Sequence, residues 1–242
     1  MSSTVSHPAF ILVRPQLCEN VGTALRALWN CGFSDLRLVR PRNPWPSEKG
    51  VRAAAGASDK SGCVRTYACL EDALADRSFV FALTARKREL IKSVFSLGEM
   101  QKKVSETPAG QAGFVFGPER SGLTSDEVSL AQAIVSIDLN PDYQSLNLAQ
   151  SVLLVAHTCF SLKSSPQKGA GTYIIPTKKE LFGLAGHLEE ALEVSGYFFP
   201  EVMKEKMARN LRNMVMRLPL TDQEVRTLRG VVSHFQRLIQ KN

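Results

Sequence analysis

The chain has 242 residues and a formal net charge of +7, and 44% of its residues are hydrophobic. These values are typical of a globular protein with room for one α/β domain and a small extra module, and they exclude a disordered or low-complexity chain. The positive charge, with a sequence pI of about 9.3, favours a polyanionic partner such as nucleic acid over a dispersed surface charge.

Short apolar runs alternate with helical patterns along the first two thirds of the chain. The apolar runs predict strands at Ala9–Val13, Leu36–Arg40, Ser78–Thr84, Gly113–Gly117 and Ala133–Ile137. Helices are expected between or after them, at Val21–Cys31, Leu70–Ala75, Thr124–Ala131 and Leu146–Leu162. This alternation predicts an α/β fold with a mostly parallel sheet that is covered on both faces. Ligands of such sheets lie outside the carboxyl ends of the strands.

The pattern changes after Leu162. The stretch Lys163–Pro176 is rich in Ser, Gly, Pro and Lys and is typical of a linker. Capping boxes then begin at Thr177 and Thr221. They predict an all-helical extension with helices at Lys178–Ser195, Glu201–Arg217 and Asp222–Gln240. We therefore expect an α/β domain, a linker and a helical module at 1–163, 164–177 and 178–242.

The cysteines and histidines follow no metal-binding or disulfide pattern, since neither C-x-x-C nor H-E-x-x-H occurs. The N-terminus lacks the basic flank and apolar core of a signal peptide. The longest apolar run, Val152–Phe160, is interrupted by His157 and is too short to span a bilayer. We expect a cytoplasmic protein without a metal site and without a membrane span.

The stretch Phe114–Thr124 is the most informative segment of the sequence. It is typical of a buried strand, a glycine-bounded loop and a helix that is capped by Thr124. It nearly matches the phosphate-binding pattern G-x-x-x-x-G-K-[ST], but Leu123 replaces the lysine that neutralises the phosphates. Glu119, inside the loop, would also repel phosphate. The pattern indicates close approach to a ligand that is not a nucleoside triphosphate.

The segment Asn20–Arg26 begins the first predicted helix. Asn20 is expected to be its N-cap. Thr23, Arg26 and Asn30 fall on one face, which is interpreted most simply as solvated. The alternative is that Arg26, near the ligand end of the sheet, meets a phosphate.

The loop Asp138–Leu148 follows a predicted buried strand. It can be interpreted as a proline turn in which Ser145 or Asn147 caps the next helix. Asn140, Ser145 and Asn147 could equally hydrogen-bond a polar ligand.

Basic residues cluster in two stretches near the expected ligand end of the sheet. One stretch is Arg86–Arg88, and the other contains Arg37, Arg40, Arg42, Lys49 and Arg52. Such runs are usually solvated, but their position also favours contacts with a phosphate backbone.

Taken together, three motifs resemble a known family. N-x-G-x-x-x-R at Asn20–Arg26, F-G-P-E-x-x-G-L at Phe116–Leu123 and S-L-N-L at Ser145–Leu148 are similar to the signatures of SpoU-type SPOUT RNA 2′-O-methyltransferases. Their order and spacing match as well. Thr84–Arg86 and the C-terminal Leu228–Gly230 narrow the resemblance to the TrmJ-like tRNA methyltransferases.

The resemblance implies an α/β sheet whose C-terminal segment forms a trefoil knot, an exception to the usual absence of knots. It also implies that S-adenosylmethionine binds in the knot. The residues that would hold this cofactor are Leu83, Thr84, Ala85, Gly117, Ile137, Ser145, Leu146 and Asn147. A sulfonium cofactor without phosphate also fits the absence of a P-loop lysine.

The resemblance further implies a central role for Arg26 in binding the RNA phosphate and in deprotonating the ribose 2′-hydroxyl. Because the pKa of arginine lies above about 12, the phosphate role is favoured over the role of base. The other residues implied in catalysis are Asn20, Glu119, Ser145 and Asn147.

The resemblance implies that tRNA is the substrate, with the ribose at position 32 of the anticodon loop as the target. It implies a homodimer in which each active site is completed by the partner subunit. The alternatives are 2′-O-methylation of another tRNA or rRNA nucleotide and a non-catalytic RNA-binding protein. A P-loop NTPase is disfavoured by the missing lysine.

Overall fold

The computed structural model describes residues 7–57, 64–84, 91–161 and 174–239. Its strands are β1 (Ala9–Val13), β2 (Leu36–Val39), β3 (Val64–Tyr67), β4 (Phe79–Leu83), β5 (Ser93–Phe95), β6 (Ala112–Phe116) and β7 (Ala133–Val135). Its helices are α1 (Cys18–Asn30), α2 (Glu48–Ala54), α3 (Leu70–Leu74), α4 (Leu97–Glu106), α5 (Ser125–Ser129), α6 (Leu148–Phe160), α7 (Lys178–Val194), the 3-10 helix η3 (Glu201–Met203), α8 (Lys204–Arg217) and α9 (Asp222–Ile239).

The strands form one seven-stranded sheet in the order β3-β2-β1-β6-β4-β7-β5, in which every neighbouring pair is parallel. Central strand β1 places Phe10 opposite both Leu36 of β2 and Phe114 of β6. The prediction of a mostly parallel α/β sheet is confirmed. Because the strands are parallel, all their carboxyl ends, and the loops that follow, lie at the same edge of the sheet.

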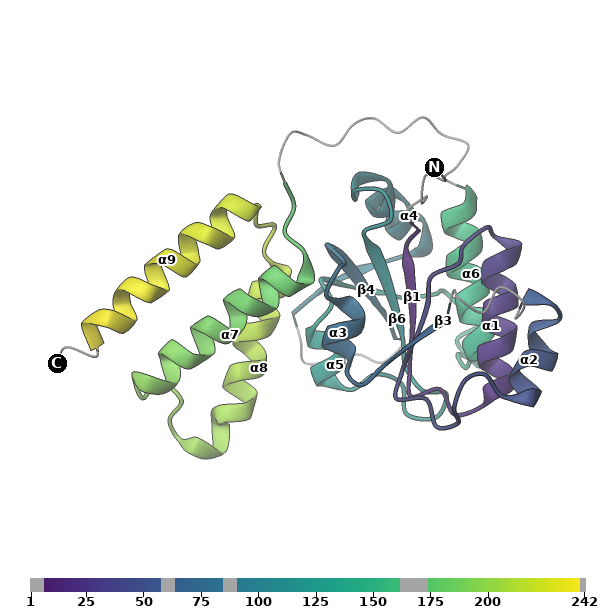
Figure 1. Cartoon of the computed structure of the whole chain (residues 1–242), viewed down its shortest axis with the longest axis horizontal. Helices are drawn as coiled ribbons and strands as arrows, with labels where there is room; N and C mark the ends of the chain where they lie inside the picture. The colour runs from purple at the N-terminus through teal and green to yellow at the C-terminus, as the bar shows by residue number, and fades with distance from the viewer. Residues whose placement is uncertain (1–6, 58–63, 85–90, 162–173, 240–242) are drawn as a thin grey trace.

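Side chains of the sheet alternate between two buried faces. In β1, Phe10 and Leu12 pack into a core with α1, α2, α4 and α6, whereas Ala9, Ile11 and Val13 pack into a second core with α3 and α5. Figure 1 shows α1, α2 and α6 on one side of the sheet, and α3 and α5 on the other. Burial on both faces explains why the central strands are continuous apolar runs in the sequence.

The sequence analysis does not predict four of the observed elements: β3, β5, α2 and α4. Strand β3 has the sequence VRTY with two exposed residues, and β5 is three residues long with two exposed. Helix α4 buries only Met100, and α2 buries only Gly50 and Ala54. None of these segments carries the long apolar pattern on which the prediction depends.

Helices α1 and α2 meet at two glycines. A Cβ atom on Gly22 would lie 2.0 Å from the carbonyl oxygen of Gly50. A Cβ on Gly50 would lie 2.6 Å from the Trp45 ring. The two helix backbones therefore touch directly, which no residue with a side chain would allow. Gly22 of the N-x-G-x-x-x-R motif consequently has a packing role.

The helical module (residues 178–239) has its own small core and also contacts the sheet domain. Leu181, Leu184, Val215, Met216 and Val225 pack together at the junction of α7, α8 and α9. The expected apolar stripe of α9 is only partly buried, because Val225 and Val232 are covered while Leu228, Phe235 and Leu238 are exposed. Most of the predicted linker lies outside the described residues.

Lys178 anchors this module to the sheet domain. Its side chain is fully buried, and Nζ donates a hydrogen bond to the Leu130 carbonyl at 2.6 Å. Burial lowers the pKa of Lys178, and the nearby Lys92 lowers it further. Burial, together with Arg217, lowers the pKa of Lys92 to about 7. An ion pair between Arg209 of α8 and Asp126 of α5 makes a second connection.

Arg37 does not belong to a basic surface, in contrast to the interpretation of the sequence. It is 1% exposed and forms ion pairs with Asp35 at 2.7 Å and with Asp76 at 2.5 Å. Burial opposes ionisation of Asp76, but hydrogen bonds from Arg37 and Arg77 lower its pKa. The guanidinium thus ties β2 to the end of α3 and is unavailable to RNA.

We expect Gly22→Ala to destabilise the protein by about 1–3 kcal/mol, because the new Cβ overlaps the α2 backbone. Gly98→Ala in α4 is the matched control, since a Cβ at that position meets nothing within 4 Å. That change should be neutral or stabilising by up to about 1 kcal/mol. Urea denaturation of both variants measures the difference, and equal stabilities would show that α1 and α2 do not touch in solution.

Candidate active site

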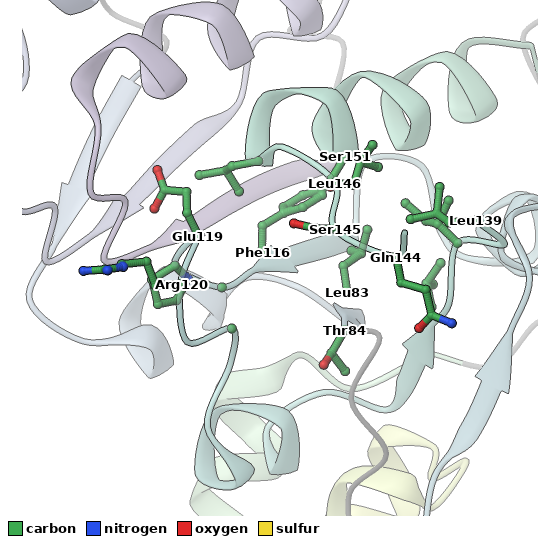
Figure 2. Close-up of a pocket in the computed structure, with 16 residues that line it drawn as sticks. Leu83, Thr84, Phe116, Glu119, Arg120, Leu139, Gln144, Ser145, Leu146 and Ser151 are labelled. Atoms are coloured by element: carbon green, nitrogen blue, oxygen red, sulfur yellow. The ribbon is translucent and has the colours of Figure 1, made fainter. Parts of the chain in front are cut away.

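A pocket of about 250 Å³ opens at the carboxyl ends of β4, β6 and β7. Its residues come from the three strand ends, from the segments that follow these strands and from the first turn of α6. Figure 2 shows these side chains around one hollow, with the Ser145 hydroxyl directed towards the side on which Glu119 lies. The pocket is lined by Leu83, Thr84, Phe116, Gly117, Pro118, Glu119, Arg120, Gly122, Val135, Ile137, Leu139, Gln144, Ser145, Leu146, Leu148 and Ser151.

The pocket loop, Gly117–Leu123, forms one wall of the pocket and is tightly folded. A Cβ on Gly117 would lie 2.3 Å from the amide nitrogen of Leu123, and Gly122 has a φ of +65°. Both positions therefore require glycine. Leu123 is fully buried in the core between the sheet and α5. The residue at the position where a P-loop has its lysine is thus part of the core and does not line the pocket.

Glu119 connects this loop to the start of α1. Its carboxylate accepts hydrogen bonds from the amides of Gln16 at 3.0 Å and Leu17 at 3.4 Å, and from Nδ2 of Asn20 at 2.7 Å. The expectation that Asn20 is the N-cap of α1 is wrong. Leu17 occupies that position without a side-chain cap, and Asn20 lies inside the first turn. The helix gains its polar contacts from a distant loop, a pairing that no local pattern reveals.

Asn20 also links the first motif to the third. Its Oδ1 accepts a hydrogen bond from Nδ2 of Asn147 at 3.0 Å. Asn147 in turn is the N-cap of α6, because its Oδ1 accepts from the amides of Ala149 at 2.8 Å and Gln150 at 3.4 Å. The predicted capping by Asn147 is confirmed. Glu119, Asn20 and Asn147 therefore form one hydrogen-bonded chain that joins the three motifs, and Glu119 is the member that lines the pocket.

Six of the residues expected to hold a cofactor line the pocket: Leu83, Thr84, Gly117, Ile137, Ser145 and Leu146. Asn147 lies behind the wall, in the hydrogen-bonded chain. Ala85 lies outside the described residues, and so does the basic stretch Arg86–Arg88. The binding roles of these residues remain predictions.

Arg26 does not line the pocket. Helix α1 buries Ala24, Leu25, Ala27 and Leu28, which leaves Thr23, Arg26 and Asn30 exposed. This confirms the solvated face seen in the sequence. Among the described residues, Arg26 has no hydrogen-bond or ion-pair partner. Its guanidinium is therefore available to a ligand or a second protein surface.

Several lining residues are absent from the sequence prediction, among them Arg120, Leu139, Gln144 and Ser151. Arg120 occupies a variable position of its motif, and Ser151 lies one helical turn beyond Leu148. The helical period would have found Ser151, whereas the inward position of Leu139 and Gln144 depends on the course of an irregular loop. Within the described residues there is no cluster that could hold a metal ion and no helix long and apolar enough to cross a membrane.

The chain matches two protein families along its length. Residues 8–157 match the SpoU rRNA Methylase family, and residues 179–242 match the C-terminal domain of the tRNA methyltransferase TrmJ. The chain is 33% identical over 233 residues to the tRNA (cytidine/uridine-2′-O-)-methyltransferase TrmJ of Cronobacter sakazakii, covering 93% of this chain and 94% of that protein.

Solved structures resemble the chain as well. The crystal structure of TrmJ from Z. mobilis ZM4 is 41% identical with a TM-score of 0.85, covering 95% of this chain and 99% of that chain. The SpoU methyltransferase AviRb from Streptomyces viridochromogenes, in complex with AdoMet, is 16% identical with a TM-score of 0.54, covering 68% of this chain and 64% of that chain. At this low identity, AviRb supports the fold alone.

The chain Glu119–Asn20–Asn147 predicts an effect of charge on stability. We expect Asn20→Asp to destabilise the protein by about 2–4 kcal/mol at pH 7, because it buries a second carboxylate beside Glu119. Asn20→Ala, which removes the hydrogen bonds without adding charge, should cost about 1–3 kcal/mol. The new carboxylate has a raised pKa in the folded protein, so the difference between the two variants should shrink as the pH falls towards about 4, the pKa of aspartate in the unfolded chain.

The control is Asn210→Asp on the exposed surface of α8, which should change stability by less than about 0.5 kcal/mol. Chemical denaturation across the pH range measures all three variants. If Asn20→Asp is as stable as Asn20→Ala at pH 7, the carboxylate of Glu119 does not face Asn20 in solution.

Proposed function

The chain belongs to the SpoU rRNA methylase family, and we propose that it transfers a methyl group from S-adenosylmethionine to a ribose 2′-hydroxyl of tRNA. One observation supports this most strongly: hydrogen bonds join three motifs that are far apart in the sequence, and two of these motifs line one pocket at the carboxyl edge of the sheet. The TrmJ relatives, which are named tRNA 2′-O-methyltransferases, support tRNA as the substrate.

The pocket suits a nucleoside cofactor without phosphate. Leu83, Ile137, Leu139 and Leu146 offer apolar walls of the kind that hold a flat base, and the Thr84 and Ser145 hydroxyls lie nearby. The close turn at Gly117 lets backbone approach the ligand. Once bound, S-adenosylmethionine supplies an electrophilic methyl group. The chain's own part is to orient that group and to bring the ribose hydroxyl to it.

We assign Arg26 to the RNA side of the reaction. Its exposed guanidinium can grip a phosphate through two parallel hydrogen bonds and so position the adjoining ribose. A proton-accepting role is less favourable, because arginine stays charged at neutral pH. We assign Asn20, Glu119 and Asn147 to holding the start of α1 and the start of α6 in place. Ser145, which faces the hollow, is assigned to contacts with cofactor or ribose.

We further propose that the protein acts as a homodimer with a composite site. Arg26 does not line the pocket of its own chain, so a second protomer is the natural source of the arginine at each pocket. Helix α6 supports this, because Leu153, Leu154 and Phe160 are 41%, 37% and 46% exposed on a helix that packs against α1. An apolar strip of this kind beside the site fits a subunit interface. A trefoil knot and a cytoplasmic location also remain proposals.

The helical module is proposed to capture the tRNA body. Its basic residues on α8 and α9 are interspersed with acids, so each contributes modestly, and phosphate contacts of this kind set affinity more than sequence choice. We propose position 32 of the anticodon loop as the target. Another tRNA or rRNA nucleotide is the alternative, and a non-catalytic RNA-binding role would require that no methyl transfer occurs.

Arg26→Ala should abolish methyl transfer while leaving S-adenosylmethionine affinity unchanged within about twofold, since the side chain lies away from the pocket. Arg26→Lys should also lose at least about tenfold in kcat/KM, because lysine lacks the planar fork. The measurement is labelled methyl transfer to tRNA transcripts, followed by mass-spectrometric mapping of the methylated ribose.

Asn30→Ala on the same exposed face of α1 is the matched control and should keep full activity. Full turnover by Arg26→Ala would contradict the role of this residue. Methylation at a position other than 32 would correct the target alone, whereas a wild-type protein that neither binds S-adenosylmethionine nor methylates RNA would contradict the proposed function.

Mixing two inactive variants tests the composite site. If the two residues act from different protomers, a heterodimer of Arg26→Ala with Ser145→Ala has one site with both substitutions and one site with neither. Random exchange should then restore roughly a quarter of wild-type activity. If they act within one protomer, every site stays defective. A monomer in light scattering at the assay concentration would contradict the dimer.

A further inference from the structure

An ion pair outside the three motifs connects the β1–α1 loop to α5, the helix that follows the Gly117–Leu123 loop. Arg14, the first residue after β1, donates from both Nη atoms to the Glu127 carboxylate in α5, and the Nη2–Oε2 distance is 3.1 Å. The Glu127 side chain is 11% exposed, and that of Arg14 is 40% exposed. Two parallel hydrogen bonds between charged groups fix both distance and orientation.

Glu127 has a second task at the end of the pocket loop. Its Oε2 accepts from the Thr124 amide at 2.8 Å, while the Glu127 amide donates to Thr124 Oγ1 at 3.2 Å. This capping box fixes the point at which the Gly117–Leu123 loop enters α5. Because one carboxylate serves both tasks, Arg14 is connected directly to the end of the loop that lines the pocket.

Arg14 is held in an unusual backbone conformation. Its φ is +46°, in the left-handed region that a long side chain adopts at some cost, and its amide donates to the Val39 carbonyl at 2.7 Å. Two residues later, the amide of Gln16 donates to Glu119. The β1–α1 loop is therefore connected to both ends of the Gly117–Leu123 loop. Gln16 contacts Glu119 near the start of that loop, and Arg14 contacts Glu127 just after its end.

We propose that Arg14 and Glu127 are a positioning pair that holds the Gly117–Leu123 loop in the shape that binds the cofactor. The inference rests on the proposed function, because it assumes that this pocket binds S-adenosylmethionine. Neither residue lines the pocket, so the pair acts through the loop and does not touch the ligand. The pair determines cofactor affinity and leaves the transfer step itself unaffected.

The test uses two matched substitutions in the full-length protein. Glu127→Gln keeps a residue that can complete the capping box but removes the charge that Arg14 binds. Glu99→Gln makes the same change in the capping box of α4, where the Glu99 side chain accepts from the Ser96 amide and has no arginine partner in the described part of the chain. The measurements are calorimetric binding of S-adenosylmethionine without RNA, steady-state methyl transfer to tRNA, and melting temperature.

We expect Glu127→Gln to raise both the Kd and the KM for S-adenosylmethionine about fivefold to tenfold, the effect of losing a charge-assisted contact. The kcat at saturating cofactor should change by less than about twofold. Glu99→Gln should bind like wild type even if its melting temperature falls by a similar amount. Arg14→Lys should be intermediate, because lysine keeps the charge and loses the fork. Arg14→Ala combined with Glu127→Gln should be no worse than the weaker binder of the two single variants.

Three outcomes overturn the proposal. Equal cofactor affinity in Glu127→Gln and wild type would show that the pair does not shape the loop. A loss of affinity that Glu99→Gln shares would reduce the effect to general stability. A fall in kcat without a change in KM would assign the pair to the chemical step. If wild-type protein itself fails to bind S-adenosylmethionine, the proposed function fails, which is a separate result.

Discussion

The carboxylate of Glu119 is the contact on which the site depends. It accepts from two backbone amides before α1 and from Asn20, and Asn20 continues the connection to the cap of α6. Leu17, the N-cap residue of α1, gives the helix no side-chain cap. The negative charge of Glu119 near the first turn of α1 also stabilises this helix, because the N-terminal end of the helix dipole is positive. One charged group therefore organises the β1–α1 loop, the pocket loop and the start of α6. An apolar residue at this position would leave the Gln16 and Leu17 amides and the Asn20 side chain without this acceptor.

The pocket loop shows how a phosphate-binding shape is adapted to another ligand. The turn is tight, because Gly117 approaches the Leu123 amide and Gly122 has a positive φ. Leu123, however, is buried in the core below the loop. The side chain that would neutralise phosphate is thus replaced by one that fastens the loop to the sheet. The buried Leu123 makes the loop rigid without adding a positive charge. This arrangement fits a ligand that is bound through shape and backbone contacts.

The sequence predicts the centre of this fold better than its edges. The sequence predicts strand β1 with its observed bounds. Both faces of this strand are buried, so its sequence is a continuous apolar run. Strands β3 and β5 lie at the sheet edges, are partly exposed and carry no such run. Asn20 was expected to cap α1 because local patterns favour it, yet its partners Glu119 and Asn147 are 99 and 127 residues away. Six residues predicted for the cofactor line the pocket, because the motifs lie at the ends of strands. Arg37, in contrast, resembles a surface charge in the sequence, because its ion pairs with Asp35 and Asp76 are visible only in the fold.

The two sides of the site differ in how firmly they are built. The cofactor side is fixed by glycine turns, a buried leucine and a carboxylate with several donors. On the proposed RNA side, Arg26 is exposed on α1, whose backbone is held against α2 by Gly22 and Gly50. A rigid helix can place Arg26 without occupying its guanidinium, and this leaves all five donors for a phosphate. The backbone of α1 is thus fixed in place while the Arg26 guanidinium stays available for binding. Because Arg26 does not line the pocket of its own chain, the proposed reaction needs RNA or a second protomer to bring the two sides together.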